Sequence, residues 1–134
     1  MKVSKIDLEA LPWKRPIKDS KNYYIFEDRY PVTKGHLLIV PKWNSEMCIN
    51  ECFGIALQEG SKMISKGECD AYNIGFNDGE TAGQTVMWPH IHFIPRRAGD
   101  CEDPTGGVRA VIPGKANYRK KEVDETGGIE SGIV

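Results

Sequence analysis

The sequence predicts an α+β fold, in which an antiparallel sheet of about five strands carries one main helix on one face. Several short segments rich in β-branched and aromatic residues, each bounded by turn residues, predict the strands. One longer segment, residues 44–67, has apolar residues at helical spacing instead. Because no repeat and no low-complexity linker divides the 134 residues, we expect a single domain over residues 1–134.

The first strands follow a polar N-terminal segment. Residues 1–20 are rich in Lys, Pro and acidic side chains, which predicts an arm or a short helix. Residues Asn22–Glu27 are aromatic and β-branched, and His36–Val40 form a short apolar run that ends at Pro41. The turn residues Thr33-Lys34-Gly35 lie between these two segments, so the sequence predicts a β-hairpin.

One amphipathic helix of about five turns is predicted after this hairpin. Asn44 or Ser45 can cap its N-terminus, with Glu46 in the first turn, and Gly67 is well placed to end it. The apolar residues that recur every three to four positions are Cys48, Cys52, Ile55, Ala56, Met63 and Ile64.

The second half of the chain alternates strands with glycine-containing loops. Ala71–Asn77 predicts a third strand, Asn77–Gly83 a loop, and Gln84–Pro95 a longer fourth strand. Gly106–Pro113 predicts a fifth strand. Residues 122–134 contain turn residues and little periodicity, so we expect a mobile tail there.

Charge and hydropathy exclude several classes of protein. With 18 Lys and Arg against 19 Asp and Glu, the net charge of −1 gives no field that would gather nucleic acid. No apolar stretch approaches the roughly 18 residues of a membrane-spanning helix, and the N-terminus lacks the apolar core of a secretory signal. We therefore expect a cytoplasmic protein with neither nucleic acid nor membrane as a partner, and four reduced cysteines.

All three histidines lie in two short segments, around His36 and around His90 and His92. On the predicted fourth strand, His90 and His92 share one face, and the apolar residues between and beside them share the other. The apolar face can pack on the helix, which leaves the histidines to line a cleft beside the glycine-containing loop. Pro89 cannot donate to a ladder, so the strand lies at an edge or is distorted there.

This pair of histidines favours chemistry at phosphorus. A neutral imidazole nitrogen can attack an electrophile while a neighbouring ring donates a hydrogen bond or a proton. The loop Asn77–Gly83 can present backbone N–H groups to an anion, as phosphate nests do. Two alternatives remain from the spacing alone. One is a metal pair completed by His36, for which no further ligand has a supporting spacing, and the other is ordinary surface polarity.

The order of several short motifs resembles the histidine triad (HIT) family of nucleotide hydrolases and transferases. These motifs are Gly35-His36, Pro41-Lys42, Gly83-Gln84-Thr85-Val86, His90-Ile91-His92 and Pro95-Arg96, and the similarity runs from about Tyr23 to about Tyr118. The resemblance implies a HIT-like α+β fold, two subunits that commonly join their sheets, a nucleotide cleft in each subunit, and no metal or other cofactor in catalysis.

The same resemblance implies a two-step hydrolysis at the α-phosphorus of a nucleoside 5′-phosphoryl conjugate. His90 matches the nucleophile, which would form a nucleotidyl-histidine that water resolves. His92 would stabilise the phosphoryl oxygens or the leaving group, and Gln84 is the third expected catalytic residue. The other matched positions predict phosphate contacts from Asn77, Gly83 and Thr85, a ribose contact from Asp28, a base contact from Phe26, and support of the triad by His36.

One departure concerns the first histidine of the triad, which is Trp88 in this chain. That position supports the nucleophile rather than attacking, so its loss leaves His90 in place and bears on the orientation and basicity of His90. The first position also supplies a zinc ligand in some members, so its replacement argues against zinc. A nucleotide-binding protein with weak turnover is therefore an alternative function.

A basic segment follows the motif. Residues 96–121 contain seven basic and three acidic residues, a local net charge of +4, and resemble an extension found in bacterial members described as dinucleoside polyphosphate hydrolases. Arg96, Arg109 and Lys115 are candidates for the distal phosphates, although a solvated basic loop is an equally simple interpretation of each. We expect a dinucleoside polyphosphate as substrate. Phosphoramidase or nucleotidyltransferase activity is the alternative, because the same attack serves several leaving groups.

Overall fold

The computed structural model describes residues 3–119, 122–123 and 129–130. Contacts divide the chain into two compact units, Met1–Arg97 and Ala98–Val134, and each is described by itself. The first unit contains the sheet, the long helix and all three histidines. The expectation of a single domain is not tested by this division and stays a prediction.

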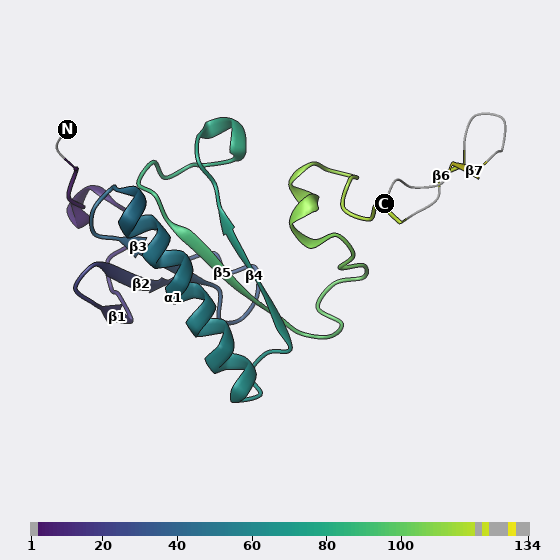
Figure 1. The fold of residues 1–134 in the computed structure, drawn as a ribbon, viewed down its shortest axis with the longest axis horizontal. Helices are drawn as coiled ribbons and strands as arrows, with labels where there is room; N and C mark the ends of the chain where they lie inside the picture. Colours follow the sequence, from purple (N-terminus) through teal and green to yellow (C-terminus); the bar gives the residue numbers. More distant parts are fainter. Residues whose placement is uncertain (1–2, 120–121, 124–128, 131–134) are drawn as a thin grey trace. The chain divides into compact units, whose positions relative to one another are not determined.

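An antiparallel five-stranded sheet organises the first unit (Figure 1). Its strand order is β1 (Lys18–Asp19), β2 (Tyr23–Glu27), β3 (Leu37–Pro41), β5 (Ile91–Arg96) and β4 (Ala71–Phe76). The predicted hairpin is confirmed, because β2 and β3 pair with Ile25 opposite Ile39. The predicted third strand corresponds to β4. The expected α+β class with one main helix is therefore correct.

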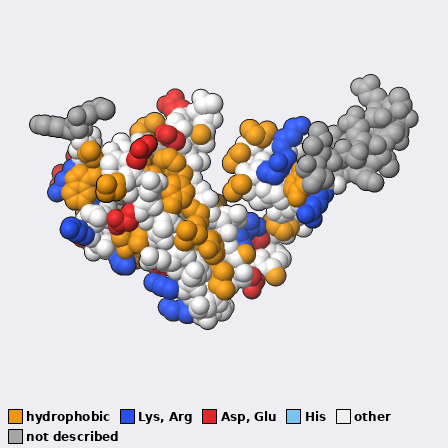
Figure 2. All heavy atoms as spheres, viewed as in Figure 1, with side chains coloured by type: hydrophobic (Ala, Val, Ile, Leu, Met, Phe, Trp, Pro, Cys, Tyr) orange, Lys and Arg blue, Asp and Glu red, His pale blue; other side chains and the backbone are white. Residues whose placement is uncertain are grey.

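Helix α1 (Glu46–Ser65) covers one face of this sheet (Figure 1). Ser45 caps it, with its side chain accepting a hydrogen bond from the backbone N–H of Cys48, and Gly67 follows at a φ of 71°. Cys52 and Ala56 of the helix are fully buried against Ile39, Ile91 and Phe93 of the sheet. Figure 2 shows hydrophobic side chains on the surface along the helix. Met47, Leu57 and Ile64 are the exposed large hydrophobic residues of α1.

The opposite face of the sheet is covered by the N-terminal arm instead of a helix. The arm contains one short 3₁₀ turn, η1 (Leu8–Ala10), which Asp7 caps through the backbone N–H of Glu9. Trp13 is buried there against Phe26, Leu38 and Val40. Alternation along β2 and β3 therefore sends one set of side chains toward α1 and the other toward the arm.

Two predicted strands are wrong. The strand predicted over Gln84–Pro95 begins only at Ile91. The side chains of Gln84 and Trp88 hold the first half of that segment by hydrogen bonds to the backbone carbonyls of Val86 and Pro41. The loop predicted over Asn77–Gly83 is confirmed, because it contains the 3₁₀ turn η2 (Glu80–Ala82) and Gly83 at a φ of 97°. The sheet still has five strands, because the short strand β1 in the arm takes the place of the strand that was predicted over Gly106–Pro113.

The segment Gly106–Pro113 instead forms a 3₁₀ helix in the second unit, η3 (Gly107–Val111). Gly106 has a φ of 89°, and an added Cβ there would lie only 1.7 Å from the carbonyl oxygen of Ala116. The close approach requires glycine at this position, and the left-handed φ is incompatible with an extended strand there. The unit also contains two short paired strands, β6 (Glu122–Val123) and β7 (Ile129–Glu130). The other residues of the expected mobile tail lie outside the described residues.

Among the described residues, neither α1 nor any of the short helical turns has the apolar length that crossing a membrane requires.

Candidate active site

Two of the three histidines line a cavity of about 410 Å³ on the face of the sheet away from α1. His92 is the second residue of β5, and His90 lies just before that strand begins. The shared face predicted for these two residues is therefore confirmed, although His90 does not belong to the strand. The loop between β4 and β5 contributes Asn77, Gly83 and Thr85 to the same cavity.

His90 is held in one orientation by its neighbours. Its Nδ1 lies 2.8 Å from the backbone carbonyl oxygen of Trp88, so Nδ1 carries the proton and donates to that oxygen. The ring of Trp13 contacts the imidazole edge to face, with ring centroids 4.9 Å apart. In the neutral ring, the lone pair is consequently on Nε2, which is the nitrogen available for nucleophilic attack.

The ring of His92 is hydrogen-bonded to the ring of His36. The backbone N–H of Val32 donates to Nδ1 of His36 at 3.2 Å, so the proton of this neutral ring is on Nε2. That Nε2 lies 2.9 Å from Nδ1 of His92 and donates to it. His92 must then carry its own proton on Nε2. Asp28 completes the cluster, with Oδ2 3.4 Å from Nε2 of His36.

Burial keeps all three rings neutral at neutral pH. Burial lowers the pKa of His92 to about 4, and the neighbouring His90 and His36 lower it further, against an opposing effect of Asp28. Burial also lowers the pKa of His90, although the hydrogen bond to the Trp88 carbonyl opposes this effect. The pKa of His36 is lowered by burial as well, with Asp28 opposing. Two neutral rings therefore lie side by side, one with a free lone pair on Nε2 and one with an N–H that can donate a hydrogen bond.

Gln84 is buried, and its two polar atoms hold the loop rather than face the cavity. Oε1 accepts a hydrogen bond from the backbone N–H of Gly79 at 2.7 Å, and Nε2 donates to the carbonyl of Val86 at 3.0 Å. The cavity with the histidines is not lined by Gln84, which instead lines a neighbouring hollow. The structure thus places Gln84 where it shapes the loop that presents Gly83 and Thr85.

A second cavity, of about 650 Å³, adjoins the first and shares Asp28 and Trp13 with it. Phe26 lies in this second cavity, so the residues predicted for ribose and base are brought together there. Asp28 is also fixed locally, because its Oδ1 accepts from the backbone N–H of Tyr30 at 2.8 Å.

Sequence reasoning missed the contribution of the N-terminal arm to both cavities. Pro12 and Trp13 line the two cavities, and Trp13 touches both Phe26 and His90. A single Trp in an otherwise polar, proline-containing arm is the sequence signal that could have indicated it. Nothing in the local pattern indicates which part of the sheet it covers.

The three basic residues predicted for distal phosphates are placed in different parts of the chain. Arg96 ends β5, where its guanidinium donates to Oδ1 of Asn73 on β4 at 2.8 Å. Arg109 and Lys115 belong to the second unit. There Nε of Arg109 donates to the backbone carbonyl of Lys115 at 3.2 Å, and the guanidinium lies 5.1 Å from the ring of Tyr118.

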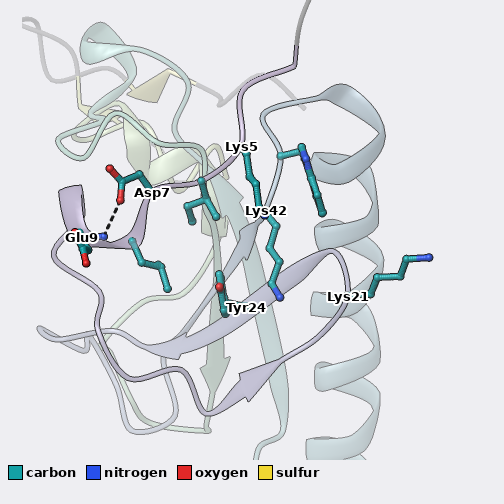
Figure 3. Close-up of a pocket in the computed structure, with 9 residues that line it drawn as sticks. Lys5, Asp7, Glu9, Lys21, Tyr24 and Lys42 are labelled. Atoms are coloured by element: carbon teal, nitrogen blue, oxygen red, sulfur yellow. Dashed lines mark hydrogen bonds between the residues drawn. The ribbon is translucent and has the colours of Figure 1, made fainter.

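A further cavity of about 450 Å³, shown in Figure 3, lies between the arm and strands β2 and β3. Lys5, Lys21 and Lys42 line it together with Tyr24. Lys42 pairs with Asp19 and packs over the ring of Tyr24 at 4.4 Å. This cavity contains none of the residues that the sequence singled out for the site.

Comparison with known proteins decides the family. The family model described as the HIT domain matches residues 14–99, which include all three histidines and the loop before them. The chain belongs to the HIT domain family. The resemblance noted in the sequence is therefore confirmed. This family includes nucleotide hydrolases, as the names of several relatives show.

Three curated relatives illustrate how similar this chain is to other HIT proteins. An uncharacterized HIT-like protein of Methanocaldococcus jannaschii is 36% identical over 92 residues, which cover 64% of this chain and 71% of that protein. The adenosine 5′-monophosphoramidase HNT1 of Saccharomyces cerevisiae is 32% identical over 82 residues, covering 59% of this chain and 52% of the enzyme. The bis(5′-nucleosyl)-tetraphosphatase of Schizosaccharomyces pombe is also 32% identical, with shares of 56% and 45%. The match thus spans about half of either fungal enzyme.

The fold is similar to that of solved HIT proteins. The crystal structure of a Zn-bound histidine triad family protein from Mycobacterium smegmatis superimposes with a TM-score of 0.59 at 29% identity, covering 63% of this chain and 67% of that chain. The HIT-like α+β fold expected from the sequence is confirmed.

Because that relative is Zn-bound, the donor atoms present here bear on whether this chain fits a metal. Asp28, His36 and His92 offer ligand atoms that all lie within 4.8 Å of one another. A metal would need an unprotonated Nε2 on His36, whereas the N–H of Val32 holds the lone pair on Nδ1 and leaves the proton on Nε2. These three residues therefore fit a hydrogen-bonded chain and do not fit a metal in this arrangement.

Proposed function

We propose that this protein is a nucleotide hydrolase that attacks the α-phosphorus of a nucleoside 5′-phosphoryl conjugate. Nε2 of His90 forms a bond to phosphorus while the bond from phosphorus to the leaving oxygen or nitrogen breaks, which gives a nucleotidyl-histidine. Water then attacks the same phosphorus, releases the nucleoside monophosphate and returns the electron pair to His90. The tautomer of His90 carries this proposal, because the contact between Nδ1 and the carbonyl of Trp88 leaves Nε2 as the attacking atom.

His92 supports the proposed reaction as a donor. Since Nδ1 of His92 accepts from His36, its Nε2 carries the proton and can donate a hydrogen bond to a phosphoryl oxygen or to the leaving group. A lowered pKa makes the neutral ring the relevant form at neutral pH, so this proton is a hydrogen-bond donor without a full positive charge. Gly83, Thr85 and Asn77 line the same cavity and are the candidates for holding the phosphate oxygens.

Asp28 and Phe26 support the assignment of ribose and base to the adjoining cavity. Asp28 lines both cavities, so a ribose bound to its carboxylate would place the 5′-phosphate beside His90. Phe26 and Trp13 are buried aromatic residues that line the adjoining cavity, with ring centroids 5.9 Å apart. A nucleotide would then span the two cavities with its base away from the histidines.

The substrate we propose is a dinucleoside polyphosphate, with diadenosine tri- and tetraphosphate the first to test. The name of the Schizosaccharomyces pombe relative favours this leaving group, whereas the yeast phosphoramidase favours a phosphoramidate. Attack at the α-phosphorus is common to both. A nucleotide-binding protein with weak turnover stays the second candidate, because Trp88 stands at the first position of the triad.

The test compares the wild type with His90→Ala and His90→Gly on both diadenosine polyphosphates and on adenosine 5′-phosphoramidate, with and without EDTA. We expect AMP release by the wild type alone, unchanged by EDTA. Adenosine 5′-phosphorimidazolide should still be hydrolysed by His90→Gly, because this compound supplies the missing ring already bonded to phosphorus. Equal AMP release by the wild type and His90→Ala would contradict the assignment of the nucleophile. Tight AMP binding without turnover of any substrate would support the binding protein.

We also propose a homodimer that joins the sheets of two subunits. Strand β4 lies at one end of the strand order, and its outer side pairs with no other strand of the part of the chain that the structure describes. An exposed edge strand is a template for pairing with a second copy. Light scattering at several concentrations tests this, and a monomer at every concentration would contradict it.

A further inference from the structure

The segment that carries His90 is held mostly by side chains. Positions 85–90 belong to no described strand or helix, since β5 starts at Ile91 and the turn before it ends at Gln84. Two side chains anchor this segment instead. Gln84 binds the carbonyl of Val86, and the indole Nε1 of Trp88 donates to the carbonyl of Pro41 at 2.9 Å.

The anchor used by Trp88 is a rigid part of the fold. Pro41 is the last residue of β3, the central strand of the sheet, which pairs with β2 on one side and β5 on the other. Pro41 itself is fully buried. The indole ring also packs on the apolar cluster that contains Trp13 and Phe26. The indole N–H and the apolar surface of the Trp88 ring are therefore both fixed relative to the sheet.

The backbone of Trp88 passes this constraint to the nucleophile. Its carbonyl oxygen accepts the hydrogen bond from Nδ1 of His90 at 2.8 Å, and only Pro89, with its restricted φ, lies between the two residues. The direction of that carbonyl decides which nitrogen of His90 is protonated. The fixed indole thus restrains the direction of the Trp88 carbonyl. That carbonyl in turn determines which tautomer His90 adopts.

We propose that Trp88 is the positioning residue for His90, and that its indole N–H, bound to the carbonyl of Pro41, holds the Trp88 carbonyl against Nδ1 of His90. This inference rests on the proposed function. It accounts for a Trp at the first position of the triad, because the position acts through its backbone carbonyl and needs only a side chain that anchors it.

The test separates the indole N–H from the bulk of the ring. Trp88→Phe keeps an aromatic ring and removes the donor, and Trp43→Phe is the matched control, because Trp43 lies outside the histidine cavity and its ring packs under Lys5. Incorporation of 3-benzothienylalanine at position 88 provides a second variant, which keeps the shape of indole and lacks the N–H. This second variant serves if Trp88→Phe does not fold.

Histidine ¹⁵N NMR at neutral pH reports the tautomer directly. We expect the wild type and Trp43→Phe to show His90 protonated at Nδ1, and both Trp88 variants to show a mixture of the two tautomers. With a hydrolysed substrate, kcat should fall about 3- to 10-fold in the Trp88 variants, the loss expected for one hydrogen bond, while KM changes little.

The two readouts distinguish failure of this inference from failure of the proposed function. An unchanged tautomer of His90 in both Trp88 variants would overturn the positioning role, whatever the activity. A shifted tautomer in a protein that hydrolyses no nucleotide would uphold the positioning role and reject the hydrolase. A fall in kcat with an unchanged NMR signature would show that Trp88 acts through packing alone, which also overturns the inference.

Discussion

Nε2 of His36 lies 2.9 Å from Nδ1 of His92, and this contact determines which nitrogen of His92 carries a proton. His36 is itself fixed by the N–H of Val32 at its other nitrogen. A backbone amide outside the cavity thus sets the donor that His92 offers inside it. The buried His36 acts on the site through His92, consistent with the supporting role expected from the sequence.

The first prediction concerns His36. In His36→Ala, Nδ1 of His92 loses its donor, so His92 can adopt the other tautomer and Nε2 no longer always carries a proton. We expect kcat for the hydrolysed nucleotide to fall about tenfold. The loss combines one hydrogen bond between neutral rings with the fraction of His92 that adopts the other tautomer. Steady-state kinetics checks this, with His36→Asn as a variant that keeps a polar donor. Equal rates for the wild type and His36→Ala would contradict the relay.

The second prediction concerns stability at acid pH. His92 has a usual pKa of 6.5 when the chain is unfolded and about 4 when it is folded. Between these values the unfolded chain binds the proton and the folded chain does not, so the free energy of unfolding falls as the pH falls through this window. The lowered pKa values of His36 and His90 act in the same direction.

Urea unfolding at several pH values measures this dependence. In His92→Asn the neutral side chain cannot take up a proton in either state, so the loss of stability between the two pKa values should be smaller than in the wild type. A wild type and a His92→Asn variant with the same dependence on pH would contradict the assignment.

The third prediction concerns the pH dependence of activity. The attacking form of His90 is neutral, and burial holds its pKa below the usual 6.5. Activity should therefore persist at pH values where an exposed histidine is already mostly protonated, and fall only at lower pH. The profile of kcat/KM against pH reports the ionisation of the free enzyme. A midpoint at or above 6.5 on the acid side would contradict a buried, neutral nucleophile.

The fourth prediction concerns the packing of α1 on the sheet. A Cβ added at Gly60 would lie 2.3 Å from Cε1 of Tyr72, whose ring packs on Phe93 at a centroid distance of 5.5 Å. We expect Gly60→Ala to destabilise the protein by about 1–3 kcal/mol, the usual cost of overpacking. Gly54→Ala is the matched control on the same helix, because an added Cβ there meets nothing within 4 Å.

Gly54→Ala should stabilise the protein by about 0.5–1 kcal/mol, because alanine has the higher helix propensity. Urea unfolding compares the two variants with the wild type. Similar effects of the two substitutions would show that Tyr72 moves aside without cost.

Local patterns in the sequence were sufficient for most of the framework. The hairpin of β2 and β3 followed from two β-branched runs around turn residues, and α1 followed from its apolar spacing and the cap at Ser45. These signals are local, since alternation and helical spacing reflect which side of a single element is buried. The motifs around His36, His90 and His92 also indicated the family, and through it a set of site residues.

The tertiary structure decided the features that depend on distant contacts. The arm places Trp13 against His90, Trp88 reaches Pro41 across 47 positions of the sequence, and Val32 fixes the tautomer of His36. The predicted strand over Gln84–Pro95 failed for a related reason, because Gln84 and Trp88 hold its first half by side-chain bonds that alternation does not reveal. The sequence by itself therefore predicted His90, His92 and several of the loop residues that line the same cavity. Only the folded chain decided which nitrogen of each ring is protonated, because that depends on donors and acceptors brought together from separate segments.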